Sequence, residues 1–171
     1  MTAMFHVEPI KRMVFKTACI FFMFAVAVSC ASRNKIVIEG YLVLPNGKEI
    51  LGHDSLNAFV FENIHKETSF QNYLSNKYAV LDIKAPEFSV TIDGSQYKVI
   101  VYDNVEFEKY FRVSDFVQTH FDTDSDDANW PKFIAISMIN DRNEDCLSET
   151  SLYRNVAINY LKNLKQAYYK Q

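Results

Sequence analysis

Residues that build tight loops or covalent cross-links are scarce in this chain. Its 171 residues include four glycines, four prolines and three cysteines. So little glycine and proline argues against collagen-like, low-complexity and glycine-looped nucleotide-binding proteins. Of the cysteines, Cys19 lies inside an apolar run and Cys30 ends it. With a lipid on Cys30, Cys146 has no disulfide partner, and we expect it to be a small buried or idle thiol.

A surplus of positive charge is also absent. From residue 30 onward the chain carries 15 basic and 20 acidic residues, a formal charge of −5. We therefore expect no nucleic-acid partner, because the neutralisation of phosphates requires a basic face. Apolar residues are plentiful in contrast: hydrophobic residues make up 49% of the chain, with 14 Phe and 10 Tyr. This composition predicts one folded domain, over residues 35–171.

The first 30 residues have the layout of an export signal. Three basic residues between positions 11 and 16 precede an uncharged apolar run at residues 18–28. The run fits a signal-peptide core and is shorter than the roughly 20 residues of an ordinary membrane span. We expect residues 1–29 to be a signal peptide that is removed. An uncleaved signal anchor and ordinary signal cleavage nearby are the alternatives.

The apolar run ends in Ala27-Val28-Ser29-Cys30, which resembles the lipobox of bacterial lipoproteins. The resemblance implies cleavage before Cys30 and acylation of its thiol and new amino group, with residues 30–34 as a lipidated tether. Each buried methylene contributes about 0.8 kcal/mol, so several acyl chains hold a protein firmly at a bilayer. Ala31 and Ser32 follow the cysteine where Asp could stand, and this resembles the sorting signal of proteobacterial lipoproteins that reach the outer membrane. The implied location is the bacterial cell envelope, at the outer membrane facing the periplasm.

The rest of the sequence is rich in short strand patterns. Apolar or alternating runs predict strands at residues 35–44, from 49, and at 56–62, 78–83, 87–92, 96–102, 106–113 and 132–139. Asn46-Gly47 and Asp93-Gly94 supply the turn residues of tight hairpins. From residue 148 the apolar residues recur at three- and four-residue steps, which predicts an amphipathic helix over residues 148–169 facing the core. We therefore expect a mainly β protein, a small antiparallel β-sandwich with a C-terminal amphipathic α-helix.

Residues 36–102 carry a second resemblance. An opening strand with Gly40, the turn at residues 44–48, the Phe59-Val60-Phe61 strand and Asp93-Gly94 are similar to the transthyretin-like or carboxypeptidase-regulatory-like β-sandwich. A lipobox combined with such a sandwich resembles the type VI secretion lipoproteins. This second resemblance implies that loops of the sandwich hold a protein partner in the inner membrane.

Residues 122–127 are the sharpest candidate for a metal site. Asp122, Asp124 and Asp126 alternate in the manner of the first three ligands of a calcium-binding loop. The sixth position is Asp127 rather than Gly, and the twelfth is Phe133 rather than Glu. We therefore favour a solvated acidic loop without a metal or other cofactor, and Ca²⁺ binding is the alternative.

No catalytic motif is present. His53-Asp54-Ser55 has the residue types of a hydrolase triad, but adjacent residues cannot point at one another in the required relay. No two of His53, His65 and His120 have the spacing of metal ligands on a helix. We therefore expect a protein that is not an enzyme, with a lipid-tethered hydrolase as the alternative.

The best candidates for a binding surface are the long connections at residues 63–77 and 114–131, because function concentrates on loops held by rigid strands. Aromatic residues in or beside them are either binding anchors or core filler: Phe70, Tyr73, Phe116 and Trp130. The leading hypothesis is a membrane-anchored envelope lipoprotein that binds another envelope protein as a non-catalytic assembly module. A lipid-tethered hydrolase and a calcium-dependent ligand-binding domain are the alternatives.

Overall fold

The computed structural model describes residues 35–50, 55–65, 69–78, 87–120 and 131–171. These residues belong to one unit, Lys35–Gln171, and Met1–Asn34 form another. The expected signal peptide, Cys30 and the tether therefore lie outside the described residues. Most of the strand expected at residues 78–83 does so too.

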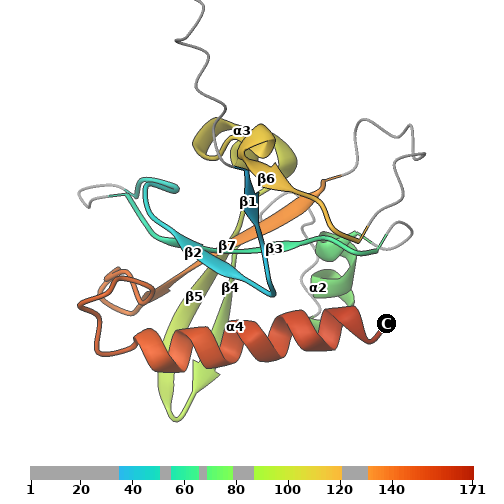
Figure 1. The fold of residues 1–171 in the computed structure, drawn as a ribbon. Helices are drawn as coiled ribbons and strands as arrows, with labels where there is room; N and C mark the ends of the chain where they lie inside the picture. Colours follow the sequence, from blue (N-terminus) through green and yellow to red (C-terminus); the bar gives the residue numbers. More distant parts are fainter. Residues whose placement is uncertain (1–34, 51–54, 66–68, 79–86, 121–130) are drawn as a thin grey trace, which may run out of the picture. The chain divides into compact units, whose positions relative to one another are not determined.

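Five strands form one antiparallel sheet in the order β2-β3-β7-β5-β4 (Figure 1). They are β2 (Leu42–Leu44), β3 (Ala58–Glu62), β4 (Glu87–Ile92), β5 (Ser95–Val101) and β7 (Phe133–Asn140). Every residue of β3 and β7 is buried. A strand covered on both faces has no polar face to present, which explains the almost continuous apolar run that forms β7. The strands predicted at residues 56–62, 87–92, 96–102 and 132–139 are confirmed, with small differences at their ends.

The β4–β5 hairpin forms where the Asp-Gly turn predicted it. Ile92 pairs with Ser95 across a two-residue turn. Asp93 and Gly94 both have positive φ, 49° and 80°. Positive φ at both central residues is typical of the type I′ turn, whose twist matches that of the flanking strands.

The first predicted strand is divided in two. β1 (Ile36–Val37) pairs in parallel with β6 (Phe116–Val117), whereas β2 joins the five-stranded sheet. Gly40 lies between β1 and β2 with a φ of 95°, a conformation that glycine adopts at little cost. The strand expected from residue 49 is reduced to one bridge between Glu49 and Ser55.

The prediction of a strand at residues 106–113 is wrong. The chain there forms a helix, α3 (Asn104–Tyr110). The Asp103 carboxylate accepts a hydrogen bond from the Glu106 amide at 2.7 Å, and the Asp103 amide donates to the Glu106 carboxylate at 3.5 Å. This reciprocal capping box starts a helix and outweighs the strand propensity of the aromatic residues that follow.

The amphipathic helix predicted at the C-terminus is confirmed as α4 (Arg154–Tyr169), although it begins six residues later than expected. Its buried stripe consists of Ala157, Leu161, Leu164 and Tyr168. Two shorter elements were not expected, the helix α2 (Phe70–Tyr78) and the 3₁₀ turn η1 (Val113–Asp115). Within the described ranges, none of the helices has both the length and the apolar character needed to cross a membrane.

Both faces of the central strands β3 and β7 are covered. Ile134, Ile136 and Met138 of β7 belong to a core that includes residues of α2 and α4. Phe133 and Ala135 belong to a second core, which includes residues of α3 and β6. The fold is therefore a mixed α/β one with substantial strand content and a C-terminal helix. The expected sandwich is not confirmed, because the described residues place helices where a second large sheet would pack.

Cys146 is buried in the first core, with no exposed surface, and is a free thiol as expected. Burial, together with the nearby charges of Asp145 and Glu144, raises the pKa of the thiol to about 12. The side chain therefore stays protonated at any physiological pH and serves as a small apolar packing group.

Gly47 provides a test of how tightly this fold packs. A Cβ at this position would lie 2.5 Å from the Tyr102 hydroxyl oxygen and 2.9 Å from the Leu56 carbonyl oxygen. The hydroxyl is fixed, because it accepts from the Lys48 amide at 2.7 Å and contacts Ser137 Oγ at 2.9 Å. We expect Gly47→Ala to lower the free energy of unfolding by about 1–3 kcal/mol in chemical denaturation.

The control is the same substitution in a Tyr102→Phe background. Removal of the hydroxyl removes the closest clash, so Gly47→Ala should cost less there. An equal cost in the two backgrounds would show that Tyr102 does not limit the space at residue 47.

Candidate functional site

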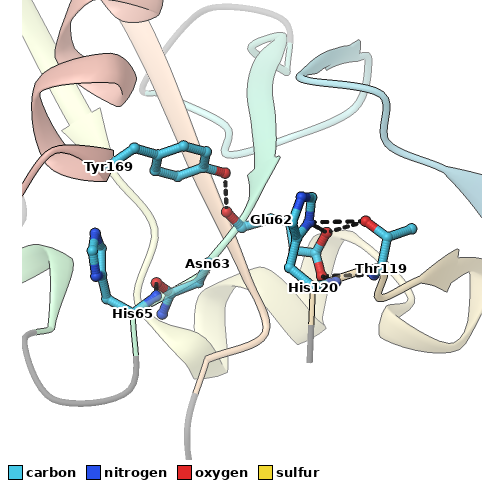
Figure 2. A network of polar contacts seen from close by, with 6 residues as sticks. All are labelled: Glu62, Asn63, His65, Thr119, His120 and Tyr169. Carbon is cyan, nitrogen blue, oxygen red and sulfur yellow. Dashed lines mark hydrogen bonds and ion pairs between the residues drawn. The ribbon is translucent and has the colours of Figure 1, made fainter. Parts of the chain in front are cut away.

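A buried carboxylate stands at the end of β3. Glu62 follows four apolar residues in a strand that is buried along its whole length, and the residue is 2% exposed. Its two oxygens accept four hydrogen bonds from one short segment: Thr119 N (2.7 Å), Thr119 Oγ1 (2.7 Å), His120 N (2.9 Å) and His120 Nδ1 (2.7 Å). Figure 2 shows these donors converging on the carboxylate.

These donors decide the charge of Glu62. Burial alone would raise the pKa of the carboxyl group, but the hydrogen bonds from His120 and Thr119 together lower it below its usual value. The group is therefore ionised at neutral pH. A carboxylate can only accept, so His120 donates from Nδ1 and directs its other nitrogen away from Glu62. The His120 side chain is 61% exposed.

The next residue, Asn63, holds the chain on the other side of residues 121–130. Its backbone nitrogen donates to Lys132 O at 2.9 Å, and its side-chain nitrogen Nδ2 donates to Pro131 O at 2.9 Å. Glu62 thus binds the two residues before this segment and Asn63 binds the two residues after it. We call Glu62 and Asn63, with these partners, the clamp.

The end of α4 is bonded to the same two residues. The Tyr168 hydroxyl donates to Asn63 Oδ1 at 2.8 Å, and the Tyr169 hydroxyl donates to the Glu62 carbonyl oxygen (Figure 2 shows the latter bond). His65 Nε2 lies 2.8 Å from Tyr168 O. Burial raises the pKa of both tyrosines above the usual value, so both remain hydroxyl donors. The end of the C-terminal helix therefore holds both residues of the clamp in place.

The clamp is built to hold a segment rather than to carry out catalysis. A carboxylate that accepts four hydrogen bonds and has a lowered pKa is a poor proton acceptor. The hydroxyl that contacts His120 belongs to Thr119 and lies 2.9 Å from Nδ1, the nitrogen already bonded to Glu62. A hydrolase relay needs the nucleophile at the opposite nitrogen. No group of three or more His, Cys, Asp or Glu within the described ranges could hold a metal ion.

The structure buries three of the four aromatic residues proposed as a binding surface. Phe70, Tyr73 and Phe116 are 1%, 5% and 9% exposed, and each belongs to a core cluster. Their rings pack within the domain, as the core-filler interpretation of these residues predicted, and little of them is left for a partner. Trp130 lies outside the described residues.

The candidates for metal binding, triad chemistry and lipid attachment are mostly beyond the described ranges as well. Asp122, Asp124 and Asp126 lie outside them, as do His53, Asp54 and Cys30. Ser55 is described, and its hydroxyl lies 3.5 Å from the Asn46 side-chain oxygen. Sequence reasoning missed Glu62, for which the one available signal was a charged residue at the end of an apolar strand.

Comparison with protein-family models, with curated proteins and with solved structures finds no match to this chain. The case for a function therefore rests on the residues and contacts of this chain. Among them, the clamp is the arrangement in which two consecutive residues, Glu62 and Asn63, bond to the residues on both sides of residues 121–130.

We expect Glu62→Gln to lower the free energy of unfolding at pH 7 by about 2–3 kcal/mol, because hydrogen bonds to a buried charge are lost. The pKa of Glu62 in the folded state lies below its ordinary value of 4.5. Its ionised form therefore stabilises the fold above about pH 4.5, and this contribution is lost as the pH falls through the folded-state pKa. The difference between the two proteins should narrow in acid, which denaturation at a series of pH values measures.

The matched control is Glu87→Gln. Glu87 lies on β4, and its partly exposed carboxylate is 3.8 Å from Lys98 Nζ. Such a pair contributes about 0–1 kcal/mol, so the control should show little loss at neutral pH. A Glu62→Gln protein as stable as this control would contradict a structural role for the buried carboxylate.

Proposed function

We propose that this protein is a lipid-anchored component of the bacterial cell envelope that binds another envelope protein without catalysis. Its anchor is Cys30, its location is the outer membrane facing the periplasm, and its binding surface is the connection between His120 and Pro131. The clamp is the observation that carries the proposal. It holds the residues on both sides of that connection through Glu62, the last residue of a buried strand, and through Asn63, which follows it.

A connection whose flanking residues are fixed is suited to recognition. Binding sites concentrate on loops that a rigid scaffold positions. The ordering of a loop costs free energy when a partner binds, and fixing its ends before binding lowers that cost. The segment includes Trp130, and tryptophan is among the residues enriched in binding hot spots. Four of its ten residues are Asp, which favours a partner with a basic surface.

The proposed anchor is consistent with where the folded unit starts. Residues 31–34 separate Cys30 from the unit that begins at Lys35. Four extended residues reach at most about 15 Å, so acylation of Cys30 would keep the domain close to the bilayer. The likeness of residues 36–102 to transthyretin-like sandwiches stays a prediction, with the antiparallel β4–β5 hairpin as its support. The likeness of the lipobox combined with such a sandwich to type VI secretion lipoproteins stays a prediction as well.

Mass spectrometry of protein purified from membranes tests the anchor. We expect the chain to begin at Cys30 and to carry acyl groups there. Cys30→Ser should move the protein from the membrane fraction to the soluble fraction, because the acyl chains supply the membrane affinity. An unmodified Cys30 thiol on freely diffusing protein would refute the lipoprotein proposal.

Site-specific photo-crosslinking in intact cells tests the binding surface. A photoreactive residue at position 125, inside the clamped connection, should give one discrete protein adduct. The adduct should be several-fold weaker with Glu62→Gln, because the connection is then held less firmly. The control is the same photoreactive residue at position 105 on α3, where Val105 is 78% exposed.

Equal yields of adduct from positions 125 and 105 would contradict a specific surface at the clamped connection.

The same experiment with and without a calcium chelator tests the calcium-dependent alternative. If the adduct disappears with the chelator, the acidic residues act through Ca²⁺ rather than directly on the partner.

A further inference from the structure

Two adjoining grooves lie at the other end of β7 from the clamp. The first has a volume of about 520 Å³ and is lined by residues before β3 and by the connection from β7 to α4. The second, of about 660 Å³, is lined by the start of β5 and the end of β7. Arg142 and Tyr153 line both. Figure 1 shows the connection, at residues 141–153, looping between the end of β7 and the start of α4.

The wall of these grooves is rigid before any ligand binds. Asn140 Oδ1 accepts from the amides of Arg142 (3.0 Å) and Glu144 (2.9 Å), and Asn140 Nδ2 donates to Glu144 Oε2 at 2.7 Å. Asp145 accepts from the Asn57 amide at 2.8 Å and from the Leu147 amide at 2.8 Å. The turn is therefore fixed by the protein itself, and a ligand would not have to order it.

Tyr153 lies where the two grooves meet, and its ring packs against another aromatic ring. The ring of Tyr97, which is 4% exposed, lies 6.0 Å away at an interplanar angle of 72°, so it supports Tyr153 in an edge-on contact. Arg142 Nη2 lies 3.4 Å from the Tyr153 hydroxyl oxygen. Because Tyr153 lines both grooves, a ligand that spans them passes over this side chain.

The charges of the lining exclude several ligand classes. Asp141, Glu144 and Asp145 supply three carboxylates, and Arg142 supplies one guanidinium, which lies 3.4 Å from Glu144 Oε2. A phosphate, nucleotide or acidic peptide would meet net negative charge. Leu152 is 94% exposed but is the one strongly exposed aliphatic residue of the lining, so an apolar ligand would find little to bind.

Beside its net negative charge, the lining offers a surface suited to hydroxyl groups. Six Ser, Thr and Asn residues line the first groove, and Ser95, Gln96 and Asn140 line the second. Amides and hydroxyls offer donors beside acceptors, and carboxylates add further acceptors, as neighbouring hydroxyls of a sugar require. An aromatic ring offers its face to the apolar C–H face of the same sugar. The two grooves in succession are large enough for an extended chain rather than a single ring.

We propose that the grooves on either side of Tyr153 bind a neutral oligosaccharide, with one pyranose ring stacked on Tyr153. Asp141, Arg142 and Asn143 then bond to the hydroxyl groups of adjacent sugars. The proposal concerns the Asn140 end of β7 and does not depend on the lipid anchor or on the clamp.

Saturation-transfer NMR on the full-length protein tests this, with tetra-N-acetylchitotetraose and cellotetraose as separate probes and spermine as a cationic comparator. We expect transfer to the ring protons of at least one sugar. Tyr153→Phe, which keeps the ring, should retain affinity, and Tyr153→Ala should weaken it by about tenfold. Val105→Ala, on an exposed position of α3, is the control and should change nothing.

Because loss of Tyr153 removes a contact with the core residue Tyr97, Asp141→Asn and Arg142→Gln provide surface variants that leave the packing intact. Each should weaken sugar binding several-fold, with an unchanged thermal transition. Weak sugar binding has a Kd of about 1 mM, so a sugar concentration of about 10 mM would nearly saturate the site. The proposal is overturned if neither sugar shows transfer at that concentration. It is also overturned if Tyr153→Ala leaves sugar binding unaffected. Transfer to spermine alone would identify a cation-binding groove instead.

Discussion

A buried negative charge organises one end of this domain. A carboxylate without partners could not remain ionised at 2% exposure, so Glu62 requires the donors that Thr119 and His120 supply. That requirement fixes a point of the chain 57 residues away in sequence. The same strand end also holds Asn63, Pro131 and the last turn of α4. One polar cluster thus joins the end of the strand, the residues that flank residues 121–130 and the end of the C-terminal helix.

The central strand β7 separates the two surfaces for which we propose roles. Its first residue, Phe133, pairs with Glu62 of the clamp, and its last, Asn140, organises the turn beside the grooves. Eight residues of extended chain span roughly 25 Å. The strand is buried throughout and is paired on both sides, so it is a rigid spacer. A protein partner at one end and a glycan at the other could bind at the same time without competing for the same residues.

Features with local causes could be predicted from the sequence, and features that depend on distant partners could not. The Asp93-Gly94 hairpin and α4 follow from turn chemistry and from the spacing of apolar residues. The helix α3 also has a local cause, the capping box at Asp103, but the aromatic residues around it favoured a strand. The layer that covers each face of the sheet and the partners of Glu62 depend on contacts between distant segments. For the same reason, aromatic side chains in a connection gave no sign of whether they would face solvent or the core.

The free thiol at Cys146 has a consequence for where such a domain can work. Its sulfur has no exposed surface and stays protonated at physiological pH. Disulfide exchange and oxidation both proceed through an accessible thiolate, which this residue does not offer. The folded domain is therefore indifferent to the redox potential of its surroundings, and passage from a reducing to an oxidising compartment leaves the chemistry of its core unchanged.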